Sequence, residues 1–373
     1  MHRILSVFCS IGMFASMGTP LAFAEDELKG LLDRLLATPE IQTESGFSAS
    51  VLVPLGKLYD PVWLMAHNDS VWTNDDGGEE EGKGSQIVAI GKDGTTSVVV
   101  KLGRLLPVTG FGIAPAGFGD WSGQLVSLAQ AETAAPGATK NHVIQRVVID
   151  SDDVSTVVCT LPEAGEVNQG ISGFGADARF GPDGSPFANR FFAVTLFNNT
   201  IYQLTPDGKC SPFVTLDGKP WGAPGGLAFS ADGQHLLVSV TKGGALEGME
   251  GNGAVLSIAA DGTVDEKPVV EGLTRPMGIA RVPESSAAYG GQLFITDVGQ
   301  MEIPVPMTQA LAADGKLYRV TADGQSHLVA SGFINPVGVL VVDDAVWVSD
   351  INGDFIAGKR ELPEGFVVKV QAQ

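Results

Sequence analysis

Four aspartates have the type and spacing of a metal-binding group. Asp75, Asp297 and Asp350 end the similar stretches "VWTND", "LFITD" and "VWVSD", and Asp354 follows the last of them. Carboxylates brought close together repel one another unless a cation or a proton neutralises them. Calcium accepts six to eight oxygen ligands from flexible loops. The pattern therefore predicts a calcium site, and the alternative is that each aspartate caps its own turn.

A second polar group stands directly before proline at three similar places. Asp60, Arg275 and Asn335 begin "DPVW", "RPMG" and "NPVG". A carboxylate, a guanidinium and an amide that converge on one spot form a typical set of polar contacts for a small ligand. We therefore predict a ligand site there, with a structural salt bridge and turn caps as the alternative.

Both groups depend on a unit that is repeated along the chain. The stretch from Asp60 to Asp75 aligns without a gap on the stretch from Asn335 to Asp350. Each unit has a short apolar segment, a turn and further alternating strands. Six units at a spacing of around fifty residues predict an all-β fold, a six-bladed β-propeller of four-stranded antiparallel blades. Four further copies of the unit begin at Gly110, Gly175, Pro224 and Pro276.

The two ends of the chain are expected to meet. The last unit ends after its third strand at 365–370, whereas an alternating segment at 47–53 precedes the first unit. As the outer strand of the last blade, that segment would close the ring and cover a sheet edge. Asp-Gly pairs between third and fourth strands are hairpin signals, so we assign their aspartates to turns. These aspartates are Asp93, Asp207, Asp261 and Asp323.

The first 24 residues have the features of a cleaved secretory signal. His2 and Arg3 precede an apolar run over 4–17, and a small-x-small peptidase motif ends at Ala24. We expect a periplasmic or secreted protein with a short helix and linker at 25–45 and the propeller at 46–373. No later apolar run reaches the roughly 18 residues of a membrane span. Export also permits a disulfide, and the sequence leaves open whether Cys159 and Cys210 pair.

The charge balance argues against two classes of partner. The chain has 23 Lys and Arg residues against 43 Asp and Glu residues, a formal net charge of −20. Proteins that bind nucleic acid or anionic lipid gain affinity from clustered basic residues, so we expect neither partner. Long acidic loops follow the second strands of several units, and loops on a rigid scaffold often bind ligands. A small-molecule ligand is therefore expected, and a protein partner stays an alternative.

The stretches "GGLAFSADGQHLLVSVT" and "GKLYRVTADG" resemble the six-bladed superfamily of gluconolactonases, senescence-marker lactonases and NHL-repeat proteins. The resemblance implies a lactonase-like hydrolase that holds a divalent metal with Glu, Asn and Asp at the starts of the innermost strands. The matching residues of this chain lack a side-chain oxygen for a hard cation. A non-catalytic ligand- or protein-binding propeller is therefore the alternative. The matching residues are Val62, Phe111, Ala176, Gly225, Met277 and Val337.

The stretch "GLTRPMGIARVPESSAAYGGQLFITDVGQ" resembles part of the pyrroloquinoline-quinone-dependent sugar dehydrogenases. The match is best at 297–300, which reads "DVGQ". This resemblance implies a quinone cofactor and a base, generally His, that takes a proton as hydride leaves. None of the four histidines beyond the signal stands at the expected start of an innermost strand, so the dehydrogenase is the second alternative. These histidines are His67, His142, His235 and His327.

Overall fold

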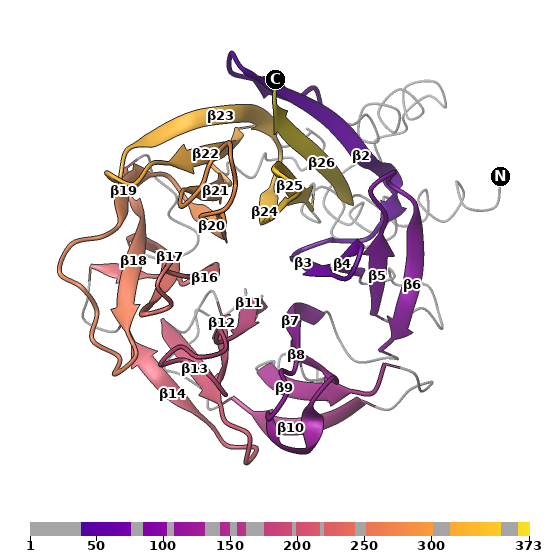
Figure 1. Cartoon of the computed structure of the whole chain (residues 1–373), viewed down its shortest axis with the longest axis vertical. Coiled ribbons are helices and arrows are strands. Elements are labelled where there is room, and N and C mark those ends of the chain that lie inside the picture. Colours follow the sequence, from indigo (N-terminus) through magenta and orange to yellow (C-terminus); the bar gives the residue numbers. More distant parts are fainter. Residues whose placement is uncertain are drawn as a thin grey trace, which may run out of the picture.

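The computed structural model is a ring of six β-sheets around a central axis (Figure 1). The predicted signal, the predicted helix at 25–38 and Asp354 lie outside the described residues. Within those residues, no helix is long and apolar enough to cross a membrane. The structure describes residues 39–75, 85–102, 108–130, 142–149, 155–161, 175–195, 199–216, 220–242, 251–300, 314–351 and 365–373.

Each sheet is an antiparallel blade whose strands follow one another outward from the channel, as the repeat predicted. Blade one has β3 (Leu64–His67), β4 (Ser70–Asp75), β5 (Gln86–Ile90) and β6 (Thr96–Lys101). Blade two has β7 (Val108–Ile113), β8 (Leu125–Gln130), β9 (His142–Val147) and β10 (Ser155–Thr160). Blade three has β11 (Gly175–Phe180), β12 (Phe191–Thr195), β13 (Thr200–Leu204) and β14 (Cys210–Thr215).

The other three blades carry the additions to this plan. Blade four has β16 (Leu227–Phe229), β17 (His235–Lys242), β18 (Gly253–Ala259) and β19 (Val270–Leu273), and β15 (Trp221–Gly222) also pairs with β17. Blade five has β20 (Pro276–Arg281), β21 (Leu293–Asp297), β22 (Gly315–Val320) and β23 (Ser326–Phe333). Blade six has β24 (Pro336–Val342), β25 (Ala345–Asp350), β26 (Gly365–Ala372) and β2 (Phe47–Leu58).

The predicted closure of the ring is confirmed. Strand β2 pairs with β26 from Phe47 opposite Ala372 to Leu58 opposite Gly365. A shorter strand that the sequence did not indicate, β1 (Gln42–Thr43), adds to the outer edge of blade five beside β23. The segment before blade one therefore supplies strands to both blades five and six.

The blades pack face to face because alternate residues of a strand point to opposite sides of its sheet. Between blades four and five, for example, Leu237 and Val255 share a buried cluster with Ile279 and Ile295. Phe294, on the other face of blade five, packs in a cluster with residues of blade six. Both faces of a blade are thus apolar, and the ring is held together mainly by burial of these faces.

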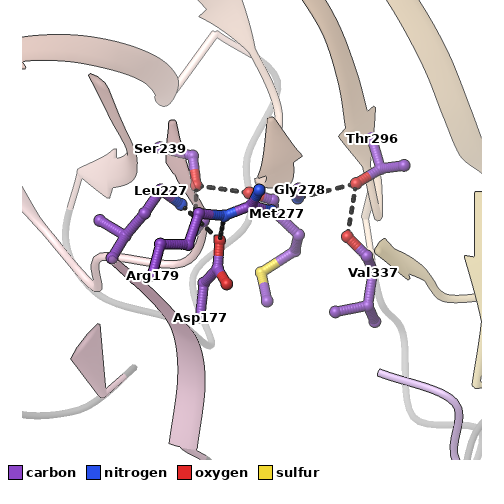
Figure 2. Close-up of polar contacts among 9 residues, drawn as sticks. Asp177, Arg179, Leu227, Ser239, Met277, Gly278, Thr296 and Val337 are labelled. Atoms are coloured by element: carbon purple, nitrogen blue, oxygen red, sulfur yellow. Dashed lines mark hydrogen bonds and ion pairs between the residues drawn. The ribbon is translucent and has the colours of Figure 1, made fainter. Parts of the chain in front are cut away.

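Hydrogen bonds join neighbouring innermost strands beside the channel (Figure 2). The Thr296 hydroxyl accepts from the backbone N–H of Gly278 at 2.8 Å and donates to the carbonyl of Val337 in blade six at 2.9 Å. A Cβ at Gly278 would lie 2.3 Å from that carbonyl, so the approach requires glycine. Ser239 and Ser349 form the same bridges between blades four and five and between blades six and one.

The Asp-Gly pairs lie in turns, as expected, but the turns are longer than two residues. Between β5 and β6, Asp93 accepts hydrogen bonds from the backbone and hydroxyl of Thr95, which lower its pKa. Gly94 follows with a φ of +81°, a conformation that favours glycine. The extra residues form a β-turn followed by a bulge, which the dipeptide alone did not distinguish from a tight hairpin.

The structure settles the pairing of the two cysteines. Cys159 of β10 and Cys210 of β14 form a disulfide, with their Cα atoms 6.2 Å apart. The bond links the outer strands of blades two and three, which are 51 residues apart in the sequence. It is therefore a covalent link between neighbouring blades at the rim.

Candidate ligand site at the channel face

In blades one, five and six, the end of the second strand lies beside the turn that leads into the innermost strand of the same blade. We call this side of the ring the channel face, defined by Asp75, Asp297 and Asp350 at those strand ends. All three aspartates are buried. In the ring, β24 of blade six contacts both β20 of blade five and β3 of blade one (Figure 1). The three blades are therefore adjacent, as the closed ring requires.

Each of the three carboxylates caps backbone N–H groups of its own blade. Asp297 accepts from Thr274 at 2.7 Å and Arg275 at 2.8 Å, and also from Gly299 at 2.9 Å. Asp350 accepts from the backbone N–H of Asn335 at 3.0 Å. Charge-assisted bonds of this kind are stronger than neutral ones. The turns before the innermost strands are thus fixed by the aspartates that end the second strands.

Blades one and six show the same contact in slightly different forms. Asp350 also accepts from the backbone N–H of Ile334 at 2.8 Å. Asp75 accepts from the backbone N–H of Tyr59 at 3.3 Å and from the side chain of Gln86 at 3.1 Å. Within the described residues no three His, Cys, Asp or Glu side chains form a group that could hold a metal. Because Asp354 lies outside them, the four-aspartate calcium site stays a prediction.

A calcium site made by these aspartates predicts a measurable gain in stability. Calcium at about 100 times its dissociation constant should add about 2.7 kcal/mol if it binds only the folded state. Thermal unfolding in EDTA and then in excess calcium measures this gain, and Asp350→Asn should reduce it. An unchanged midpoint would leave the aspartates as backbone caps alone.

The predicted ligand residues lie in the turns that these aspartates fix. Asp60, Arg275 and Asn335 are 6–7% exposed. The backbones of Arg275 and Asn335 are fixed on both sides, because their carbonyls accept from Val298 at 3.0 Å and from Ile351 at 3.2 Å. The carbonyl of Asp60 accepts from the side-chain amide of Asn74 at 2.9 Å. The two groups of residues singled out in the sequence are therefore parts of one arrangement, with the aspartates holding the turns that carry the ligand residues.

Arg275 gives the site a buried cation. Burial lowers the pKa of its guanidinium, and the charge of Asp297 opposes that shift. Asp60 adopts a φ of +46°, which is unusual for a residue with a side chain. Ala223 has the same φ at the matching place in blade four, so this conformation belongs to the turn and not to the carboxylate.

The sequence alignment matched one residue of each innermost strand to a metal ligand of the lactonases. In blade two, the strand pairing shows that a different residue holds this position. Val108 pairs with Ala129 as Pro276 pairs with Asp297, and Phe111 pairs with Ser127 as Ile279 pairs with Ile295. Thr109, and not Phe111, therefore matches Met277. The repeated Gly-Phe-Gly of this segment displaced the alignment by two residues. The corrected ring is Val62, Thr109, Ala176, Gly225, Met277 and Val337, which has one hydroxyl and no carboxylate.

A charged pair that was not predicted from the sequence lies in the channel wall (Figure 2). Asp177 of β11 accepts from Arg179 Nε at 2.6 Å and from the backbone N–H of Leu227 in blade four at 2.9 Å. Asp177 is buried and Arg179 is about a quarter exposed. The pair replaces the hydroxyl bridge between blades three and four. Its signal was available, because an Asp-x-Arg spacing on a strand puts both side chains on one face.

The described histidines lie away from the starts of the innermost strands. His67 ends β3 and lies against Trp72 with ring centres 4.2 Å apart. His235 begins the second strand of blade four, and His327 lies on the outer strand of blade five. The Asp297-Val298-Gly299 turn lies in the stretch that resembles the quinone enzymes. In this chain its aspartate accepts hydrogen bonds from backbone N–H groups, among them that of Gly299.

No protein-family model and no curated protein sequence match the chain. Solved structures do. A glucose dehydrogenase superposes with a TM-score of 0.55 at 13% identity, covering 87% of this chain and 99% of its own. The soluble aldose sugar dehydrogenase of Escherichia coli gives 0.53 at 13% identity, covering 88% and 100%. A streptogramin B lyase gives 0.50 at 13% identity, covering 89% and 100%. At these identities the likeness shows the propeller fold.

Proposed function

We propose that the protein is an exported propeller that binds a small polar molecule at the channel face of blades five, six and one. The observation that carries this proposal is the presence of Asp60, Arg275 and Asn335 on turns of three adjacent blades, each fixed by a buried aspartate. A rigid scaffold that presents a few convergent polar groups is the usual form of a small-molecule site.

Hydrolysis of a lactone is the reaction that we assign to this site. A carboxylate at Asp60 would take a proton from water as the water attacks the lactone carbonyl. The Arg275 guanidinium and the Asn335 amide would donate hydrogen bonds to the oxyanion that forms. Collapse of that intermediate breaks the ring C–O bond, and the leaving alkoxide takes up a proton to give a hydroxy acid. The blade resemblance to lactonases supports this choice.

The assigned roles predict distinct losses of activity. Asp60→Asn should reduce kcat on a reactive sugar lactone by about 10²-fold or more, because it removes the general base. Arg275→Gln should reduce kcat by about 10²–10³-fold through loss of an oxyanion donor. The release of acid from a panel of sugar lactones measures both. Arg281→Gln is the matched control, because Arg281 ends the strand that Arg275 directly precedes and pairs with Glu284 at 2.7 Å.

Two results would contradict the hydrolase. If Arg275→Gln and Arg281→Gln have the same activity as the parent chain, the assigned site is wrong. Saturable binding of a lactone without turnover, lost in Arg275→Gln, would identify the second candidate, a non-catalytic binding propeller. The corrected channel ring favours that candidate, since it lacks carboxylate ligands for a catalytic metal.

A further inference from the structure

The interface between blades one and two has a buried polar stripe where the matching faces of other blades are more apolar. Ser127 of β8 and Gln145 of β9 lie opposite one another in register, and both are fully buried. They stand between residues that pack with Trp63 of blade one in a single apolar cluster. The flanking residues are Leu125, Ala129, Val143 and Val147.

The same register position in blades four and five shows that the repeat does not require this pair of polar residues. In blade four the two matching residues are Val238 and Leu256, which are buried and apolar. In blade five they are Ile295 and Tyr318. Only blade two, among the three blades compared, places a hydroxyl and an amide here.

Two polar atoms in this interface have no hydrogen-bond partner within the described part of the chain. Gln145 Nε2 donates to Ser127 Oγ at 3.1 Å, but Gln145 Oε1 accepts nothing. Trp63 Nε1 donates to nothing, although the side chain is 98% buried. The neighbouring indole of Trp72 differs, because its N–H donates to Ser70 Oγ at 3.2 Å. Buried polar atoms are nearly always hydrogen-bonded, so this unmatched donor and this unmatched acceptor each need a partner.

The position of Trp63 brings its side chain against blade two. It stands in the repeat where blades four, five and six have Gly226, Gly278 and Gly338, whose Cα atoms face the next blade closely. Blade three also departs from glycine there, with Asp177, but that carboxylate is satisfied by Leu227 and Arg179 of the chain itself. The chain thus satisfies the polar insertion between blades three and four and leaves the one between blades one and two unmatched.

We propose that a neutral hydroxyl group binds between blades one and two, accepting from Trp63 Nε1 and donating to Gln145 Oε1. A hydroxyl is a single small group that does both. A cation does not fit this site, because the indole N–H only donates and offers the cation no lone pair. An anion does not fit either, because the amide oxygen of Gln145 would repel it. The source is either an ordered water or a hydroxyl of a small polyol. Thr109 Oγ1, which is also buried and has no partner among the described residues, lies on the innermost strand of blade two.

A crystal structure of the full chain tests this site without reference to the proposed lactonase. Crystals grown without polyol and crystals soaked in glycerol should both show density within about 3.2 Å of Trp63 Nε1 and Gln145 Oε1. An identical single peak in both identifies water, and an extended density only after the soak identifies a polyol. The site is overturned if no peak is present, or if the indole donates directly to Gln145.

Variants provide the matched comparison. Trp63→Phe and Gln145→Met each remove one partner at similar volume, so the peak should be lost in both. Trp72→Phe lies in the same interface but removes an indole that is satisfied within the chain, so the peak should remain. A peak that persists in Trp63→Phe and in Gln145→Met would show that neither side chain holds it, and would overturn the proposal.

Discussion

A chain that begins at Tyr59, and therefore lacks β2, should lose cooperative unfolding. Val53 and Leu58 of this strand are at most 1% exposed, and burial of such side chains contributes about 1.5–3 kcal/mol each. The paired backbone along β26 adds about 0.5–1.5 kcal/mol for each hydrogen bond. Together these losses are comparable to the whole free energy of unfolding of a typical protein, which is about 5–15 kcal/mol. Circular dichroism during heating measures the loss.

The control for this truncation is a chain that begins at Glu44. It lacks β1, which pairs with β23 only at Gln42 and Thr43, and it keeps β2. Its melting temperature should stay within a few degrees of the parent chain, because only a short edge strand is removed. Equal melting temperatures for the two truncations would contradict the closure of the ring by β2.

Replacing both Cys159 and Cys210 by serine should produce the second large effect. A disulfide that closes a loop of 51 residues is expected to stabilise the folded state by about 4 kcal/mol, chiefly by restricting the unfolded chain. The midpoint of thermal unfolding should fall by on the order of 5–10 °C. The parent chain in dithiothreitol should show the same fall.

The double-serine variant provides its own control for reduction. Dithiothreitol should leave its melting temperature unchanged, since the disulfide that links blades two and three is already absent. If the parent chain and the double-serine variant unfold at the same temperature under oxidising conditions, the disulfide does not contribute to stability in solution.

The fold was predictable because its signals are periodic and local. Alternating strands, turn residues and the gapless match between the first and last units were enough to place β2 beside β26. The disulfide was not predictable, since it depends on the distance between two outer strands and not on either sequence. Strand β1 is only two residues long, so its pairing has no pattern that a sequence reveals.

The candidate site was predictable only in part. The positions of Asp297 and Asp350 in the repeat were assigned correctly, but their hydrogen bonds to the turns before the innermost strands of their own blades required coordinates. The ring residue of blade two was wrong because the repeated Gly-Phe-Gly displaced the alignment by two residues, and only the strand pairing of Val108 with Ala129 fixes the register there. The roles of Trp63 and Asp177 depend on contact between blades, which no pattern within one blade contains.

The central claim, a small-molecule site at the channel face of blades five, six and one, has one most direct test. This test is a crystal structure of the protein after the crystals are soaked with a sugar lactam, an analogue of a sugar lactone that resists hydrolysis. We expect lactam density in contact with Arg275 and Asn335 and beside Asp60. An empty channel face at saturating lactam, or a separation of these three side chains by more than about 12 Å, beyond the span of a small ligand, would contradict it.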